Sequence, residues 1–512
     1  MPRTATAPSL IRNVLSNWFV LGTGVAYTLF ITPVFVRALG QEQYGVWSFL
    51  NGLLAYSDVL YFGLGSAFVK YVAECRAQND QAGVNRLASI VTIIYTALGA
   101  FCLLVALGLS GFVTQVFAEP LSPDVARAAA ITCMLLGLQL FFVFVGSAFV
   151  GLLSGYERYD LAGAVYLVGV LIRFVATPLL VRPGHEPLLT MAVLSTAVGG
   201  LSVAMLVVVS FRTVPGLALR LLRPTAAELA RLYGFGLQSF FIIFAVKLIS
   251  YTDTTVIGIT LGAASVALYT LPLQLLEYAR AAVTGFSGVF LPRLAGLAAQ
   301  KDHAALRDAY LSSMRFACVL SGWMVASMIV LGPAFLNRWV GADFGTPVQM
   351  VLLWLAVATF GQVVSTQVPL PFYQALHIVA VPAAVLTLEA AINLGLSLWL
   401  APRIGIVGVA VATVVPALLV SSVVLPPYLC RRLELRLRTL YVTSVLPGLV
   451  AAALTLALYW LSGLVIHAES YVAIAARAAL TLPVPLGVFA AALPVHERQA
   501  LWHRFAPARG QA

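Results

Sequence analysis

The chain has 512 residues, of which 61% are hydrophobic and 10% are charged, and this balance excludes a water-soluble domain. Windows of about 20 apolar residues, the length that crosses a bilayer as a helix, recur along nearly the whole sequence. The net charge of +11 does not call for a nucleic-acid partner, because cytoplasmic loops of membrane proteins collect Lys and Arg. The composition therefore predicts an all-α polytopic membrane protein.

Fourteen apolar segments, bounded by charges or by Gly and Pro, are predicted to be transmembrane helices. Six of them form the first half, at residues 9–37, 44–69, 88–113, 127–152, 160–181 and 188–211. Six more form the second half, at residues 232–258, 264–291, 311–336, 347–373, 378–401 and 405–430. An extra helix pair follows at residues 439–464 and 470–493. The first segment is too long for a signal peptide and lacks a small-residue cleavage site, so it is expected to remain as a span.

These segments divide the chain into four predicted parts. They are an N-terminal six-helix lobe (1–215), a C-terminal six-helix lobe (216–434), the extra pair (435–494) and a short cytoplasmic tail (495–512). Placing both termini in the cytoplasm puts most of the 30 Lys and Arg residues in loops on that side. Loop charge of this kind sets the orientation of a membrane protein, and this is the main role expected for the basic clusters.

An internal repeat relates the two predicted lobes. A shift of 222 residues places Leu39-Gly40 on Leu261-Gly262, and it also superposes the six helices of the first half on the next six. Each half has an even number of spans, so both halves have the same orientation, and a pseudo-two-fold axis along the membrane normal is expected. The sequence therefore predicts two parallel lobes with a cavity between them.

Ionisable and polar residues in the predicted helices are the candidate site residues. A charge near the bilayer centre costs about 2.5–3.5 kcal/mol on insertion scales, so such a side chain faces a bundle interior or a water-filled cavity. The candidates are Arg12, Asn17, Asp58, Arg173, Lys247, Glu277, Arg280 and Glu389. Asp253 and Arg477 lie closer to the outer surface, where a structural role is expected.

Two interpretations of these residues stay open. The Arg and Lys side chains would attract an anionic group such as a diphosphate, and the acids would couple transport to H+ or Na+. Alternatively, Lys247 pairs with Glu277 and Asp58 with Arg280, and these ion pairs only hold the helices together. No cofactor is expected. The five Cys residues show no CxxC motif and the six His residues are isolated, so neither a disulfide nor a metal site is predicted.

One stretch of the sequence resembles a known family. Residues 35–47 (FVRALGQEQYGVW), Asp58 and residues 62–71 (FGLGSAFVKY) are similar to the opening of polysaccharide and O-antigen flippases, within the multidrug/oligosaccharidyl-lipid/polysaccharide exporter superfamily. The resemblance implies a transporter of the bacterial inner membrane that moves a polyprenyl-diphosphate-linked oligosaccharide to the periplasmic leaflet for O-antigen or exopolysaccharide synthesis. It also implies alternating access between the two lobes, with membrane lipids and polysaccharide assembly proteins as partners.

The same resemblance implies cationic residues in the central cavity, and Arg12, Lys247 and Arg280 suit that role. The final two helices are similar to those of the lipid II flippase branch, in which extra helices form a lipid groove. A cation-coupled multidrug exporter is the main alternative, favoured by the acids within the predicted helices. A membrane-embedded glycan enzyme is disfavoured, because the sequence has no P-loop, GxSxG or HExxH motif and no long loop for a catalytic domain.

Overall fold

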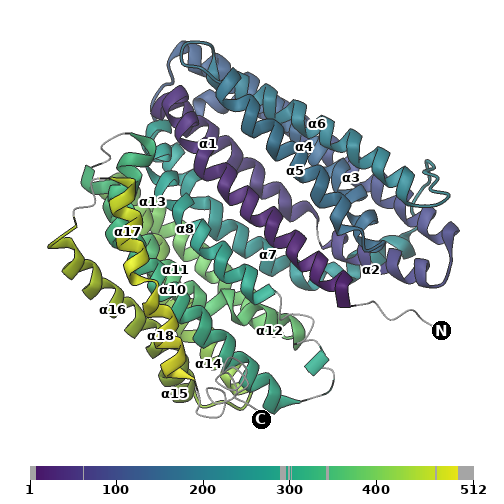
Figure 1. The fold of residues 1–512 in the computed structure, drawn as a ribbon. Helices are drawn as coiled ribbons and strands as arrows, with labels where there is room; N and C mark the ends of the chain where they lie inside the picture. The colour runs from purple at the N-terminus through teal and green to yellow at the C-terminus, as the bar shows by residue number, and fades with distance from the viewer. Residues whose placement is uncertain are drawn as a thin grey trace, which may run out of the picture. The chain divides into compact units, whose positions relative to one another are not determined.

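The structure, a computed structural model, describes residues 7–61, 63–288, 294, 296–297, 300, 302–341, 345–466 and 470–493, with side chains from residue 22 onward except in 235–239 and 285–288. Every regular element within these ranges is a helix (Figure 1). The all-α fold predicted from the composition is therefore confirmed. By their packing the residues form two compact units, residues 1–270 with 398–406, and residues 271–397 with 407–512.

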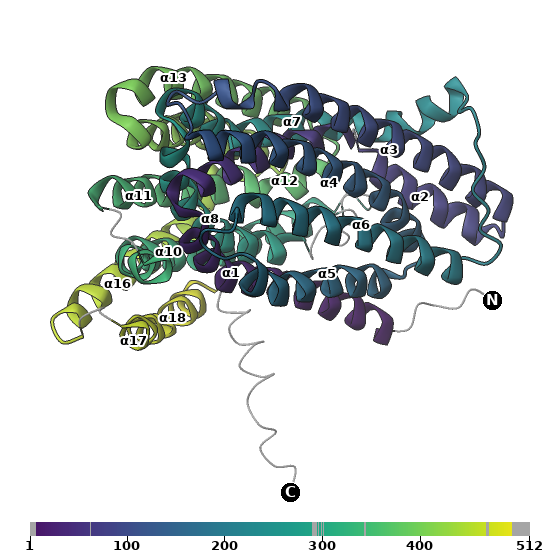
Figure 2. The same cartoon turned by 90° about the horizontal axis from the view of Figure 1, so that it is seen from above.

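The first unit contains the helices of the N-terminal half and α7. They are α1 (Ala7–Ala55), the 3-10 helix η1 (Tyr56–Tyr61), α2 (Leu64–Ala77), α3 (Gln81–Ser110), the 3-10 helix η2 (Val113–Gln115), α4 (Pro123–Gly155), α5 (Tyr159–Leu180), α6 (Pro187–Thr213) and α7 (Ala226–Leu261). Helices α3, α4 and α6 run side by side, and α5 packs on α1 and α6 (Figures 1 and 2). Helix α7 packs on α1 and α2 within this unit.

Most of the remaining helices belong to the second unit, which α8 enters after Thr270. They are α8 (Ala263–Gly288), α10 (His303–Val340), α11 (Gly345–Gln362), α12 (Pro369–Ala375), α13 (Ala380–Pro416), α14 (Ser422–Arg432), α15 (Leu437–Leu440), α16 (Leu446–Gly463), α17 (Tyr471–Thr481) and α18 (Pro483–Ala492). Three π-helical turns interrupt them, η3 (Val363–Gln367), η4 (Ala417–Ser421) and η5 (Tyr441–Val445). Such turns in helical proteins are frequent at functional sites.

Eleven helices of the described part are long and apolar enough to cross a membrane. Two of them, with 40 and 53 residues, are longer than one crossing of an about 30 Å hydrocarbon core needs at about 1.5 Å per residue. Each contains a break at a glycine with positive φ, Gly40 (69°) in the first and Gly405 (65°) in the second. Glycine adopts this conformation without a steric penalty, so the chain turns there and begins a new helix. The protein is thus multi-pass, and the number of fourteen crossings stays a prediction.

Local backbone features recur at the shift predicted from the sequence. Asp80 and Asp302, 222 residues apart, are the N-caps of α3 and α10, and each carboxylate accepts a hydrogen bond from the amide three residues later. Gly40 and Gly262 have the same separation, and both combine a positive φ with an extended ψ (−179° and 172°). The first residues of α4 and α11 are also 222 residues apart. These matches support the internal repeat, whereas the two-fold axis and the predicted lobe boundaries stay predictions.

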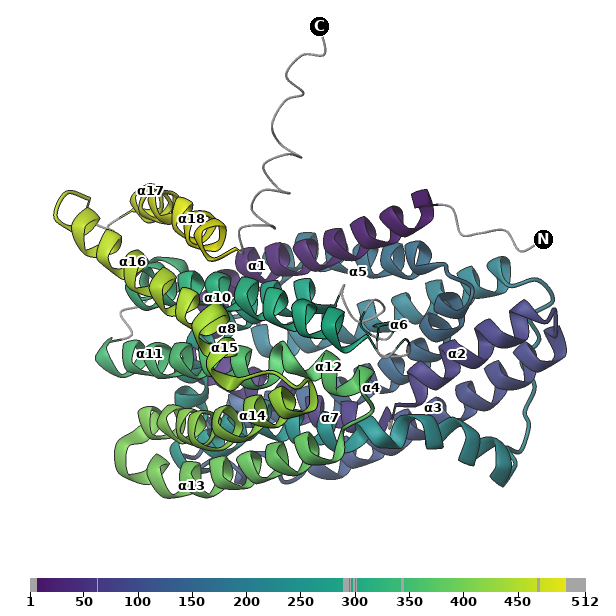
Figure 3. The same ribbon diagram turned by 90° about the horizontal axis from the view of Figure 1, so that it is seen from below.

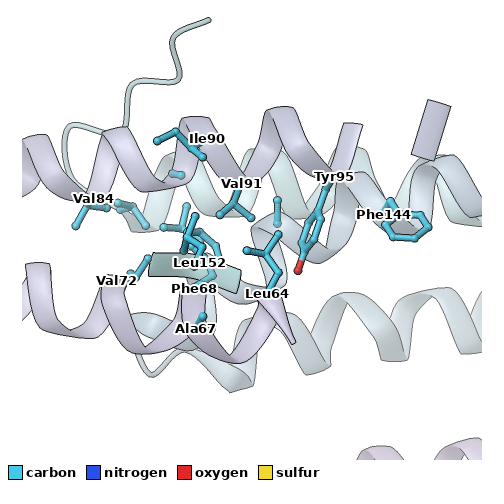
Figure 4. Close-up of a cluster of buried hydrophobic side chains, with 14 of the residues drawn as sticks. Leu64, Ala67, Phe68, Val72, Val84, Ile90, Val91, Tyr95, Phe144 and Leu152 are labelled. Carbon is cyan, nitrogen blue, oxygen red and sulfur yellow. The ribbon is translucent and has the colours of Figure 1, made fainter. Parts of the chain in front are cut away.

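The core of the first unit is formed where α2 packs on α3 and α4 (Figure 4). Leu64, Phe68 and Val72 are spaced four residues apart, so they lie on one face of α2, and all three are buried. This face meets Val91 and Tyr95 of α3 and the buried aromatic and leucine side chains of α4. The core therefore holds α2, α3 and α4 together.

Helices α10 and α16 of the second unit cross at two glycines (Figures 1 and 3). A Cβ atom at Gly322 would lie 2.1 Å from the carbonyl oxygen of Gly448, and a Cβ atom at Gly448 would lie 2.6 Å from the carbonyl oxygen of Cys318. Backbones come this close only where a side chain is missing, as in the small-residue interfaces of membrane helices. Helix α16 of the extra pair therefore packs against α10 so closely that neither glycine can be replaced by a larger residue.

Hydrogen bonds next to this crossing connect α10 to both α16 and α17. Trp323 Nε1 on α10 donates to Thr481 Oγ1 on α17 (3.0 Å), and Tyr459 OH on α16 donates to Ser327 Oγ on α10 (2.9 Å). Tyr459 is fully buried, so its hydroxyl loses its hydrogen bonds to water on folding. The bond to Ser327 replaces one of them. The extra pair thus has both close packing and specific polar contacts with α10.

The glycine crossing predicts a large effect of a small substitution. Gly322→Val should destabilise the protein by about 3 kcal/mol, because the new side chain meets a backbone carbonyl that cannot rotate away. The matched control is Gly395→Val at an exposed position of α13, where a Cβ atom meets nothing within 4 Å. Thermal unfolding in detergent should show a lower Tm for the first variant alone. Equal Tm values for the two variants would contradict the close crossing.

The linker between α6 and α7 (residues 214–225) lies along α3. Asn85 makes two hydrogen bonds with the linker backbone, one of them from its Nδ2 to the Gly216 carbonyl oxygen (2.9 Å). Ser89 Oγ, one turn further along α3, accepts from the Arg220 amide (3.0 Å). The two halves of the sequence are therefore joined by a segment that is fixed to α3.

Helix α7 begins immediately after this linker, and its start is tied to α3 as well. The N-cap Thr225 and Glu228 form a capping box, in which each side chain accepts a hydrogen bond from the other residue's backbone amide. Arg86 of α3 forms an ion pair with the Glu228 carboxylate through two hydrogen bonds. The hydrogen bond from Arg86, with those from Thr225, lowers the pKa of Glu228 from 4.5 to about 2.

This lowered pKa predicts a pH dependence of stability. The contribution of the charged Glu228 is present above about pH 4.5 and is lost as the pH falls toward about 2, where the folded protein also binds the proton. The Tm of the wild type should therefore fall more steeply between about pH 5 and about pH 3 than that of Glu228→Gln. The difference should reach at most about 1 kcal/mol, because the pair is partly solvent-exposed. Parallel pH profiles of the two proteins would refute the role of this carboxylate.

Candidate functional site

The segment predicted to be the second crossing (44–69) is broken in its middle. The α-helix α1 continues as the 3-10 helix η1. Gly63 then adopts a left-handed conformation (φ 71°), and α2 begins after it. Breaks of this kind leave backbone groups without helical partners, and within a membrane they are tolerated where the protein or a cavity surrounds them. Asp58 lies in η1, at the edge of a cavity of about 280 Å³ that Tyr61, Ser66 and Phe240 also line.

Lys247 of α7 forms an ion pair with Asp58. Its Nζ donates to Asp58 Oδ2 at 2.5 Å, and the two side chains are 24% and 46% exposed, respectively. One of the two interpretations left open by the sequence paired Lys247 with Glu277, whereas the structure pairs it with Asp58. The exposure matters because a pair that is not sealed in the protein can exchange partners with a ligand.

Aromatic rings and hydroxyl groups surround this pair. Lys247 Nζ lies 5.3 Å from the ring centroid of Tyr251, one turn along α7, and Tyr56 of η1 meets Tyr251 edge-on at 6.1 Å. Tyr56 OH is 3.4 Å from Thr252 Oγ1 and 3.5 Å from Thr255 Oγ1. Sequence reasoning missed the two tyrosines, although the four-residue spacing of Lys247 and Tyr251 indicated that they share a helix face. A cation, aromatic faces and hydroxyl groups together suit a ligand with both phosphate and sugar groups.

The second unit contains a separate charged cluster on α8 and α13. Arg280 Nη1 donates to Glu277 Oε1 at 2.6 Å, one turn away on α8. The open interpretation that paired Arg280 with Asp58 therefore gives way to a pair within one helix. Glu389 of α13 is 2% exposed, accepts a hydrogen bond from Ser421 of η4 and lies within electrostatic range of Arg280. Arg280 therefore forms its ion pair with Glu277, and Glu389 lies further away in its electrostatic field. Ser421 was not predicted, because a π-helical turn has no clear signal in the sequence.

The remaining candidates lie apart from these two clusters. Arg173 on α5 is half-buried, interacts electrostatically with Tyr27 of α1, and its Nε has no hydrogen-bond partner among the described residues. Arg12 and Asn17 fall on α1, but their side chains lie outside the described residues. These three positions stay predictions.

Two charged residues for which a structural role was expected have partners that fit this role. Asp253 is 4% exposed and accepts a hydrogen bond from Tyr269 OH at 2.5 Å. Arg477 of α17 is 7% exposed and donates to the Tyr459 carbonyl oxygen (2.6 Å) and to Ser462 Oγ (3.1 Å) in the last turn of α16. Carbonyl groups at a helix C-terminus have no helical partner, so Arg477 satisfies one of them.

Comparison with known proteins assigns the family. The family model of the lipid II flippase MurJ matches residues 62–479, which include Lys247 and the Arg280 cluster but begin after Asp58. The chain belongs to the MurJ lipid II flippase family. It is therefore a membrane transporter and not an enzyme, and the flippase resemblance of residues 35–71 is confirmed at the level of the family.

Two relatives of the chain have informative names. "Uncharacterized membrane protein EpsK" of Bacillus subtilis is 21% identical over 426 residues, which cover 82% of this chain and 83% of that protein. "Putative O-antigen transporter" of Salmonella typhimurium is 34% identical over 65 residues, which cover 13% of this chain and 14% of that protein. The similarity to EpsK extends over most of both chains, whereas the second is local.

Solved structures show the same fold at low sequence identity. The structure of lipid II flippase MurJ in an inward closed conformation has a TM-score of 0.65 and 11% identity, and the match covers 96% of this chain and 100% of that one. An inward-facing multidrug resistance transporter of the MATE family has a TM-score of 0.67 and 17% identity, with coverage of 80% and 94%. MurJ and MATE transporters therefore share the architecture of this chain.

A double-mutant cycle can test whether Lys247 and Asp58 act as a pair. Lys247→Met and Asp58→Asn should each lower the Tm, and the double variant should lose less than the sum of both, with a coupling of about 1 kcal/mol. The matched control combines Lys247→Met with Asp253→Asn, because Asp253 is bonded to Tyr269 instead. Additive losses for Lys247 and Asp58 would show that the ion pair does not contribute to the folded state.

Proposed function

We propose that the protein flips a polyprenyl-diphosphate-linked oligosaccharide across the bacterial inner membrane for the synthesis of a surface polysaccharide. Membership of the MurJ family is the observation that carries this proposal, and the name of the Salmonella relative directs it to O-antigen or a similar polymer. Both termini lie in the cytoplasm in this proposal, because that orientation places most basic loops there. Two six-helix lobes, residues 1–215 and 216–434, would open alternately to the two sides of the membrane.

Lys247 is the group best suited to receive the diphosphate. In the structure its charge is neutralised by Asp58, which avoids the free-energy cost of an unpaired ion in a low-dielectric site. A diphosphate carries more negative charge than one carboxylate, so it competes effectively for the ammonium group. Asp58, once released, becomes a carboxylate without its cation and therefore gains affinity for H+ or Na+. Substrate binding and cation uptake would then be coupled at this one ion pair.

Tyr56 and Tyr251 suit the part of the substrate next to the diphosphate. Their rings offer apolar faces, and the hydroxyl groups of Tyr56, Thr252 and Thr255 offer hydrogen bonds at the same place. Sugars present both kinds of surface, since their ring C–H groups are apolar and their hydroxyl groups are polar. This division assigns the phosphates to Lys247 and the first sugar to the tyrosines.

Arg280 is proposed as the corresponding cation of the second cluster. Its two carboxylate neighbours differ in environment, since Glu277 is half exposed and Glu389 is almost fully buried. Glu389 is bonded to Ser421, whereas the exposed Glu277 carries the ion pair with Arg280 and could yield its position to a phosphate. Arg can hold two phosphate oxygens at once, which a Lys side chain cannot do in the same planar geometry.

Complementation of a deletion strain tests the proposal. Lys247→Gln and Arg280→Gln should each reduce surface polymer at least about tenfold, because each removes a charge that compensates the diphosphate. Lys247→Arg and Arg280→Lys keep the charge and should retain more polymer than the neutral variants. Polymer is measured by gel electrophoresis of surface glycans, and protein in the membrane is measured by immunoblotting.

A matched neutralisation outside the clusters serves as the control. Arg436→Gln removes one exposed positive charge from the loop before α15 and should leave the polymer unchanged. Normal polymer from both Lys247→Gln and Arg280→Gln, at wild-type protein levels, would refute the assignment of these cations. A deletion strain with unaltered surface glycans would refute the proposed substrate class itself.

The second candidate function is export of small cationic drugs. The acids Asp58, Glu277 and Glu389 favour it, and the fold is shared with MATE transporters. The deletion strain would then become more sensitive to cationic drugs while its surface polymer stays normal. This pattern, opposite to the one expected for the flippase, separates the two functions in a single strain.

A further inference from the structure

A cavity of about 470 Å³ lies between α3 and the linker that joins α6 to α7. The α3 side of the cavity includes Thr92, Thr96 and Ala97, and the linker side includes Arg220 and Leu221. All of these residues belong to the first unit. The cavity is separate from the Lys247 cluster, because the two cavities have no lining residue in common.

The α3 wall of the cavity is a continuous stripe. Its residues from Ser89 to Ala100 recur at intervals of three and four, so they lie along one face of the helix. At about 1.5 Å per residue the stripe is about 16 Å long. Half of an about 30 Å hydrocarbon core is about 15 Å, so the stripe matches the depth of one leaflet. Small and hydroxylated side chains along it leave room for one extended acyl chain.

The linker end of the cavity is positively charged. Arg220 lines the cavity, and Arg223 follows three residues later; both side chains are exposed. In the part of the chain that the structure describes, neither guanidinium forms an ion pair. The nearby Arg86 and Arg231 differ in this respect, because they pair with Glu228 and Glu74. The two linker arginines are therefore the cations at this end that remain available for an external anion.

An exposed apolar side chain stands between the two arginines. Leu221 lines the cavity and is 95% exposed, although its neighbour Arg220 is fixed to α3 through its backbone amide. A leucine exposed to water is unfavourable, whereas a leucine next to exposed cations is favourable at the boundary between headgroups and acyl chains. The linker therefore has the composition of a segment that lies at the membrane interface.

We propose that this cavity binds an anionic phospholipid from the surrounding membrane. The lipid phosphate lies against Arg220 and Arg223, and one acyl chain extends along the α3 stripe toward Ala100. Bound in this way, the lipid contacts α3 and the linker at once and holds the linker on the helix. The site is separate from the proposed transport pathway, so it does not depend on the proposed function.

Native mass spectrometry of the full-length protein in detergent tests the proposal. The probes are phosphatidylglycerol and phosphatidylcholine with identical acyl chains. The wild type should retain phosphatidylglycerol more tightly, because only this lipid has a net negative headgroup. The variant with Arg220→Gln and Arg223→Gln should bind it about 25-fold more weakly, at about fivefold for each arginine near the membrane surface. The matched control, Arg436→Gln with Arg438→Gln, should retain phosphatidylglycerol as tightly as the wild type.

A second pair of variants tests the acyl-chain part of the site. Ala97→Trp fills the cavity and should lower the binding of both lipids at this site, whereas Leu104→Trp, on the same helix but outside the cavity, should not. Gel filtration and Tm report whether each variant is folded, and the two arginines are exposed, so their replacement should not disturb folding. If Ala97→Trp fails to fold, the arginine variants decide.

Three results would overturn the proposal. The first is equal retention of the two lipids by the wild type. The second is a loss of phosphatidylglycerol in the linker variant that is no larger than in the Arg436 and Arg438 control. The third is displacement of the bound lipid by millimolar inorganic phosphate, because the site would then recognise a free anion without need of an acyl chain.

Discussion

The cost of placing an ionised side chain in hydrocarbon is the constraint on which this structure depends. Each cation of the described clusters is compensated by groups of its own unit. Lys247 has Asp58, Arg280 has Glu277 and the buried Glu389, and Arg477 has a helix-terminal carbonyl. The compensation differs in kind, however. Arg477 is 7% exposed, whereas the carboxylate partners of Lys247 and Arg280 are partly exposed. This difference is the reason that Lys247 and Arg280, and not Arg477, are proposed to bind an anionic ligand.

Much of the architecture could be predicted from the sequence, because span length and the spacing of apolar residues follow directly from the thickness of the bilayer. The expected helices at residues 232–258 and 264–291 correspond to α7, which ends at Leu261, and α8, which begins at Ala263. The break at η1 could not be predicted. Hydropathy reports how apolar a segment is, but it does not report whether its backbone forms α-helical or 3-10 hydrogen bonds.

The ion pairs of the charged residues could not be read from the sequence for a related reason. One of the two open interpretations paired Lys247 with Glu277 because they have similar depth in neighbouring helices, whereas the structure pairs Lys247 with Asp58. Depth along a helix is given by sequence position, but the direction of a side chain around the helix axis depends on which helices lie next to it. Tertiary packing, such as the contact of α7 with α1 and η1, determines which helices are neighbours. These neighbours cannot be inferred from a single sequence. The family resemblance, by contrast, was readable because it rests on consecutive residues.

The two copies of the predicted internal repeat share helix caps and a turn glycine, but they differ in their charged residues. The N-caps Asp80 and Asp302 and the glycines at positions 40 and 262 occupy equivalent positions, yet Asp58 in the 3-10 turn corresponds to Arg280 in a regular helix. Helix caps and turns are needed by every copy of the fold, whereas the charge at mid-depth is free to diverge. One half thus presents an acid where the other half presents a base.

The meeting of Gly322 and Gly448 has a mechanical consequence. Because the two backbones are in contact, α16 cannot slide or roll on α10 without a collision, and the bonds of Trp323 and Tyr459 resist separation. The last helices should therefore move together with α10 as one rigid body in any conformational change. A ligand that immobilised these helices would also restrict the motion of α10.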